Sequence, residues 1–212
     1  LFCSPHNPVG RVWKREELEK VAQIAREHDL ILFSDEIHHD LIHQGHTHTV
    51  FAKVAGDTKM LTATAPTKTF NLAGAKVSNL IVKDPELKEK FGSGGDNMPS
   101  SLGLKLCELA YERGADWLDA LLAQVKENEL AFRNILKQKA PIIRFSELEG
   151  TYLLWADLRA MAQPKEDLER FVQENGIFPI FGDRFGEEGF GFIRINLAAP
   201  KEVIEAAANR LG

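Results

Sequence analysis

Short apolar runs alternate with a helical pattern in the first half of the 212-residue chain, and this alternation limits the fold more than any other feature. The runs are LFCS (1–4), LILFSDE (30–36), KMLTATA (59–65) and VSNLIV (77–82). LILFSDE is continuously apolar before its acids, as in a strand that is buried on both faces. The helical pattern places Leu18, Val21, Ala22 and Ala25 on one face of a helix over 14–28. Strands interleaved with helices predict an α/β fold with a mostly parallel, doubly wound sheet.

The second half has a different pattern, with longer helices and strands that are not separated by single helices. After the loop GGDNMPSS (94–101), we predict a helix over 102–114 and a long helix over about 116–139. We then expect strands in IIRFS, TYLLWADL and FGFIRINL, a helix near 164–175, and a final helix from about Lys201. This order is typical of a smaller α+β domain. We therefore predict two domains, 1–115 and 116–212, with the long helix linking them.

Composition excludes several classes of partner. The chain is 44% hydrophobic and 27% charged, as in ordinary globular proteins, and its net charge is −5. It has no basic stripe, so we expect no nucleic-acid partner, and it has no apolar run long enough to cross a membrane. Two cysteines make no disulfide framework, which suits a reducing compartment and predicts a cytoplasmic location. Because the chain starts with Leu1 in a strand-like run, we expect N-terminal sequence to be missing.

The segment SPHNPVG (4–10) follows the first run directly. Its composition is typical of a turn. The functional interpretation is that Asn7, at the C-terminal end of a strand, offers its amide to a ligand, because open α/β sheets bind ligands at that edge.

The segment ILFSDEIHHDL (31–41) places Asp35 at the same predicted edge. Asp35 either caps the next turn or holds a carboxylate for a cation. Five histidines also occur between positions 38 and 48, and they are a rival metal site, although their spacing fits no established zinc pattern. They are His38, His39, His43, His46 and His48.

Two cations stand in otherwise apolar surroundings. Lys68, in TATAPTKTFNLAG, follows a strand-like run, and a desolvated lysine has a lowered pKa that makes its amine a nucleophile for a Schiff base. Arg194 interrupts the alternating apolar residues of GFIRINL. It is either a structural ion-pair partner or a fork that binds a substrate carboxylate through two hydrogen bonds.

Taken together, these segments resemble the fold-type I pyridoxal 5′-phosphate (PLP) enzymes of the aspartate aminotransferase superfamily. The similarity is greatest to the MalY/PatB-type cystathionine β-lyase branch, and it rests on the following segments. They are SPHNPVGRVW, SDEIHHDLIHQGHTH, TKTFNLAG, LEGTYLLWADLR and FGEEGFGFIRINLAAP. The resemblance covers the whole chain but only the C-terminal half of such an enzyme. It implies that 1–115 is the C-terminal portion of the PLP-binding large domain and that 116–212 is the small domain.

The resemblance also implies a role for each matching residue. Lys68 would bind PLP covalently and move the α-proton, Asp35 would pair with the pyridinium nitrogen, and Arg194 would bind the substrate carboxylate. Asn7 would hydrogen-bond the 3′-oxygen of the cofactor, and Ile37 would pack against the ring. His38 stands where many relatives have a tyrosine that contacts the same oxygen.

Departures from the family pattern concern the cofactor phosphate. Ala65 stands where many relatives have a serine, with Thr67 as a substitute, and Lys76 stands where many have an arginine. The resemblance implies a PLP-dependent carbon–sulfur lyase or, as the alternative, an aminotransferase, and it implies a homodimer with GGDNMPSS as a candidate contact. Because the phosphate-binding loop of such enzymes lies in the N-terminal half, we expect this chain alone to bind PLP weakly and to be inactive.

Overall fold

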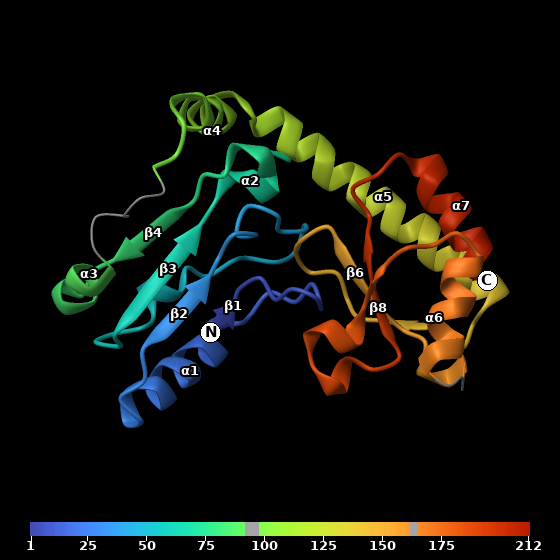
Figure 1. The fold of residues 1–212 in the computed structure, drawn as a ribbon, viewed down its shortest axis with the longest axis horizontal. Coiled ribbons are helices and arrows are strands. Elements are labelled where there is room, and N and C mark those ends of the chain that lie inside the picture. Colours follow the sequence, from blue (N-terminus) through green and yellow to red (C-terminus); the bar gives the residue numbers. More distant parts are fainter. Residues whose placement is uncertain (92–97, 162–164) are drawn as a thin grey trace. The chain divides into compact units, whose positions relative to one another are not determined.

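A computed structural model describes residues 1–91, 98–161 and 165–212. The chain divides into two compact units (Figure 1). The first unit comprises Leu1–His6 and Arg11–Asp119, and the second comprises Asn7–Gly10 and Ala120–Gly212. The division falls within the long helix α5 (Ala115–Lys139), and the short segment 7–10 belongs to the second unit.

The first unit contains a four-stranded sheet in the order β1-β2-β3-β4 (Figure 1). The strands β1, β2 and β3 are parallel, whereas β4 runs antiparallel to β3, so the predicted mostly parallel sheet has one antiparallel edge. The elements are β1 (Phe2–Cys3), α1 (Arg15–Glu27), β2 (Leu32–Asp35), β3 (Met60–Thr64), α2 (Pro66–Thr69), β4 (Asn79–Val82), α3 (Pro85–Phe91) and α4 (Ser101–Arg113).

Helix α1 supplies the core of the first unit. Its predicted stripe is confirmed, because Leu18, Ala22 and Ala25 are buried. Leu18 and Ala22 share one apolar cluster with Leu32 and Met60 of the sheet and with Phe51 of the following loop. Glu17 accepts a hydrogen bond from the backbone N–H of Lys14 at 2.9 Å, which compensates for the lack of a side-chain cap at position 14.

Only one face of β2 is fully buried. Leu32 and Ser34 are buried, whereas Phe33 and Asp35 are half-buried, and Leu30 and Ile31 are each 52% exposed. The expectation of a strand buried on both faces was therefore wrong for this chain. A continuous apolar run is typical of a parallel strand, but it does not determine which residues cover each face of that strand.

The second unit is an α+β structure around an antiparallel sheet in the order β5-β6-β8-β7. The elements are β5 (Arg144–Phe145), β6 (Leu153–Asp157), α6 (Lys165–Glu174), β7 (Ile180–Phe181), β8 (Phe192–Asn196) and α7 (Lys201–Leu211). Alternate residues of β6 and β8 pack with α5, α6 and α7, as Leu154 and Ile193 do in one cluster with Phe132, Val172 and Ala208. The edge strand β7 was not predicted, since its two residues carry too little pattern.

Other sequence predictions have clear outcomes in the described residues. The predicted helices over 102–114, about 116–139 and 164–175 correspond to α4, α5 and α6, and the final helix begins at Lys201 as expected. Residues 94–97 of GGDNMPSS, which carried the expectation of a subunit contact, lie outside the described residues. No helix in the described ranges is long and apolar enough to cross a membrane.

Candidate active site

Asp35 ends β2 at the edge of the first sheet where its parallel strands terminate. It lies in register with Ala63 of β3, and the next backbone N–H, that of Glu36, donates to Ala63 O at 2.8 Å. The Asp35 carboxylate accepts one hydrogen bond, from the Ile37 N–H at 3.2 Å, so it does cap its own turn. Among the described residues no cation pairs with it. Asp35 therefore caps its own turn, and its carboxylate still has oxygen lone pairs that could accept a bond from a further partner.

Glu36 stabilises the turn next to Asp35 through its side chain. Its carboxylate is buried, with the residue only 1% exposed. It receives hydrogen bonds from Ser34 Oγ at 2.9 Å, from His48 Nε2 at 2.8 Å and from the Phe51 N–H at 3.2 Å. A buried carboxylate is stable only when its acceptor sites are satisfied in this way. Sequence reasoning treated His48 as a possible metal ligand and missed its pairing with Glu36.

Lys68 lies on the short helix α2, directly after β3. It is half-buried, and in the described part of the chain its ammonium makes no hydrogen bond or ion pair. Thr69, the next residue, anchors the same helix, because it is fully buried and its hydroxyl donates to Asp40 Oδ2 at 2.8 Å. Asp40 belongs to the turn that follows Asp35. The backbone register of β2 and β3 therefore brings Asp35 and Lys68 to the same edge of the sheet, as the sequence predicted.

The histidines after Asp35 do not form a metal site. No group of three or more metal-ligating side chains occurs in the residues that the structure describes, and these include the whole of 38–48. His48 binds Glu36, His39 lies 3.2 Å from Asp40, and His46 is exposed, so these three side chains do not share a partner. The described residues therefore give the rival metal-binding interpretation no support.

The other predicted cofactor residues of the first unit differ in exposure. Thr67 is buried beside Lys68, His38 is 3% exposed, and Ile37 is half-buried next to Asp35. Lys76 is exposed and adopts a left-handed backbone conformation with φ 52°. Its long side chain is free to move in solvent, which suits a point charge better than a fixed fork.

Asn7 and Arg194 meet in the second unit. Arg194 lies in the middle of β8, in register with Trp155 of β6 and Ile180 of β7. Its Nη1 donates to Asn7 Oδ1 at 2.7 Å, although the two residues are 187 positions apart in the sequence. Asn7 is fixed in turn by its own segment, since the Val9 carbonyl accepts from Ser146 Oγ at 2.8 Å and the Gly10 carbonyl accepts from the N–H groups of 149 and 150.

The Arg194 guanidinium is a half-buried cation without an acid. No carboxylate pairs with it in the part of the chain that the structure describes. Burial lowers its pKa from the ordinary value of arginine, and burial likewise raises the pKa of the nearby Tyr152, an effect that the charge of Arg194 opposes. An arginine in this state remains charged, and the remaining donors of its fork suit an external carboxylate or another anion. The structural ion-pair reading of Arg194 finds no support here.

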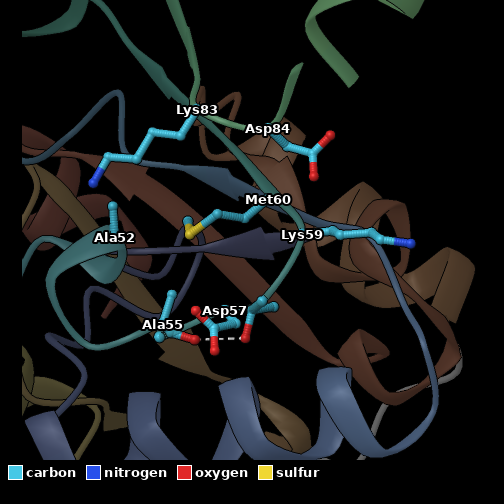
Figure 2. A pocket seen from close by; sticks show the side chains of 9 residues that line it. Ala52, Ala55, Asp57, Lys59, Met60, Lys83 and Asp84 are labelled. Atoms are coloured by element: carbon cyan, nitrogen blue, oxygen red, sulfur yellow. Dashed lines mark hydrogen bonds between the residues drawn. The ribbon is translucent and has the colours of Figure 1, made fainter. Parts of the chain in front are cut away.

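A separate cavity of about 220 Å³ lies at the other end of the strands of the first sheet, where β3 begins and β4 ends. It is lined by residues at the start of β3, including Lys59 and Met60, and by Lys83 and Asp84 after β4 (Figure 2). Figure 2 shows the Lys59 and Lys83 side chains extending in opposite directions away from Met60, so their charges do not converge. This cavity is therefore not the site that the sequence predicts.

Comparison with known proteins decides the family. The model of the family described as aminotransferase class I and II matches residues 1–211. This chain belongs to that family. The family is PLP-dependent, and its members here are lyases and aminotransferases.

Individual members of the aminotransferase class I and II family show the degree of similarity. The chain is 33% identical to cystathionine β-lyase PatB of Bacillus subtilis, and the match covers 100% of this chain and 56% of PatB. It is 34% identical to protein MalY of Escherichia coli, and that match covers 97% of this chain and 54% of MalY. The structure of cystalysin from Treponema denticola, which contains PLP, superposes with a TM-score of 0.93 at 44% identity, covering 99% of this chain and 55% of cystalysin. The chain thus spans about half the length of these relatives.

The donor set of the first unit fits the cofactor of the family in two of its three functional groups. Lys68 has no partner among the residues that the structure describes, and its amine suits the aldehyde. The Asp35 carboxylate has available lone pairs and suits the pyridine nitrogen. The phosphate is matched less well, since Ala65 offers no hydroxyl and Lys76 offers a flexible charge. These residues are consistent with a chain that supplies only part of a phosphate site.

Proposed function

We propose that the full-length protein is a PLP-dependent carbon–sulfur β-lyase that converts S-substituted cysteines to a thiol, pyruvate and ammonia. One observation carries the proposal. In a member of a PLP-dependent family, the Lys68 amine and the Asp35 carboxylate lie at one edge of the sheet, and neither has an ion-pair partner among the described residues. The similarity to cystathionine β-lyase PatB supports the lyase assignment.

In this proposal each described residue has one task. PLP, when bound, supplies an aldehyde for the amino group and a cationic ring that draws electrons away from Cα. The Lys68 amine holds the cofactor and then accepts the α-proton, while the Asp35 carboxylate keeps the ring nitrogen protonated. Arg194 binds the α-carboxylate of the amino acid, and Asn7, which accepts a hydrogen bond from Arg194 through Oδ1, is the residue proposed to contact the 3′-oxygen of the cofactor.

The overall reaction balances without an oxidant. The Cα–H bond loses its proton to Lys68, and the Cβ–S bond breaks with the electron pair leaving on sulfur, which is then protonated to the thiol. The remaining three-carbon fragment takes up one water and divides into pyruvate and ammonia. An aminotransferase would use the same residues, but its amino group would pass to a 2-oxo acid acceptor and the Cβ–S bond would stay intact. This is the alternative function.

We further propose that the 212-residue chain is inactive alone, that the full-length protein is a homodimer, and that it works in the cytoplasm. The chain offers few side chains for the phosphate, since Ala65 has no hydroxyl and Lys76 is exposed, and neither cysteine in the described ranges forms a disulfide. Gel filtration of the chain after incubation with PLP tests the first point, since a cofactor absorbance band that stays with the protein would contradict it.

The test of the lyase uses the purified full-length protein with cystathionine as substrate. We expect pyruvate and a free thiol in equal amounts without any added 2-oxo acid. If pyruvate or the corresponding 2-oxo product appears only when a 2-oxo acid acceptor is present, the protein is an aminotransferase and the lyase proposal fails.

A further inference from the structure

One face of the second sheet carries aromatic rings in place of helices. Along β6 and β8, Leu154, Ala156, Ile193 and Ile195 point toward the helical core, so the residues between them face the other way. That other face carries Trp155, Phe192 and Arg194, and the segment 182–189 adds Phe185 to it. The rings are in contact: Trp155 stacks on Phe192 with centroids 5.1 Å apart, and Phe185 meets Trp155 edge-on at 5.7 Å. We refer to Trp155, Phe185 and Phe192 as the aromatic shelf.

Two arginines stack on this aromatic shelf in different electrostatic states. Arg159 lies 4.5 Å from the Phe192 ring centroid, and both oxygens of Asp157 accept hydrogen bonds from it at 2.9 and 2.7 Å. Arg194 lies 5.1 Å from the Phe185 ring centroid and has only the neutral amide oxygen of Asn7 as a partner among the described residues. The same kind of stack therefore supports one neutralised arginine and one whose charge is still available.

The segment that carries Phe185 is held close to the sheet. A Cβ atom on Gly182 would lie 2.7 Å from the Trp155 ring and would clash with the carbonyl oxygen of Gly189, so no other residue fits there. The chain then turns at Gly186, which has φ 129°. Phe185 lies between these two glycines and is 40% exposed, so the close approach at Gly182 holds its backbone, rather than burial of its ring, near the sheet face that carries Arg194.

We propose that Phe185 is a positioning residue that fixes the plane of the Arg194 guanidinium for a planar carboxylate of the substrate. This inference rests on the proposed function, in which Arg194 binds the α-carboxylate. A ring beneath a guanidinium attracts its charge and removes water from one face, so it orients the plane in which the N–H donors lie. Nη1 is taken by Asn7, and the remaining edge presents the donors that a carboxylate can meet in the same plane.

The experiment compares Phe185→Leu and Phe185→Tyr in the full-length holoenzyme. Leucine keeps apolar bulk but has no π face, whereas tyrosine keeps the ring. A cation–π contact at a half-exposed site corresponds to a change of about fivefold in binding. We expect Phe185→Leu to raise KM for the amino acid about fivefold, with kcat and covalently bound cofactor nearly unchanged, and we expect Phe185→Tyr to restore KM.

Arg159→Gln provides the matched control, because it removes the neutralised arginine from the same aromatic shelf. It should leave KM unchanged. The proposal is overturned if Phe185→Leu leaves KM unchanged, if it lowers kcat and KM without rescue by tyrosine, or if Arg159→Gln raises KM equally. If Phe185→Leu does not fold, retention of wild-type KM in Phe185→Met, which has no ring, overturns it as well. Failure of the carboxylate-binding role of Arg194 gives a different result, since Arg194→Gln itself would then leave KM unaltered, and failure of the lyase assignment appears separately as pyruvate release that requires a 2-oxo acid.

Discussion

The two units place their candidate groups in different ways. In the first unit, Asp35 and Lys68 follow the ends of adjacent parallel strands, so backbone register alone brings them to one edge. In the second unit, Arg194 lies in the middle of an antiparallel strand, and its environment depends on Asn7, which is 187 positions away, and on Phe185 of the segment before β8. The difference teaches that an edge site is a property of topology, whereas a site on a sheet face is a property of side-chain packing.

The largest effect should come from the first unit. Lys68→Ala in the full-length protein removes the proposed proton acceptor, and we expect kcat for pyruvate release to fall by about 10³-fold or more. Lys83→Ala, at an exposed lysine outside the proposed site, is the control and should be near wild type. Steady-state kinetics with cystathionine measure both, and substantial turnover in Lys68→Ala would remove the lysine from the mechanism.

The second unit should respond through binding. Arg194→Gln leaves the proposed proton transfer in place but removes the charged fork, so we expect KM to rise by about 10²-fold with a smaller change in kcat. A change in kcat alone would contradict the claim that the second unit acts through substrate binding. Titration of the variant with an unreactive amino-acid analogue, followed by the cofactor absorbance, separates binding from turnover.

A third prediction concerns the support of the edge site. Glu36→Gln replaces a buried carboxylate that takes three hydrogen bonds, one of them from His48. We expect a loss of about 2 kcal/mol in unfolding free energy, since charge-assisted bonds weaken and an N–H donor faces donors. Thermal unfolding measures this. An unchanged melting temperature would show that the network under Asp35 contributes nothing to the first unit.

The smallest effect should distinguish the two arginines of the aromatic shelf. The hydrogen bond and charge of Arg159 lower the pKa of Asp157, so this carboxylate stabilises the fold above its ordinary pKa, and the contribution disappears as the pH falls through the lowered value. Asp157→Asn should therefore lower the melting temperature slightly at neutral pH and not at strongly acidic pH. Equal losses at both pH values would contradict the assignment.

Much of this arrangement was open to prediction from the sequence. The strand runs and helix stripes gave β1 to β4 and α1 in the right order, and the position of Lys68 after β3 followed from TATAPTK. The orientation of β4 did not follow, because apolar runs carry no direction. Neither did the pairing of Glu36 with His48, which looked like part of a metal cluster, nor the stack of Phe185 under Arg194. These contacts depend on which side chains meet in three dimensions, and residue spacing does not encode that.

The most direct test of the account is chemical trapping of the cofactor on the full-length holoenzyme. Reduction with borohydride followed by digestion and mass spectrometry identifies the lysine that carries the pyridoxyl group. The account predicts that Lys68 carries it and that Lys68→Ala abolishes the modification. Labelling of Lys76 or of exposed lysines in its place, at the same extent in both proteins, would contradict it.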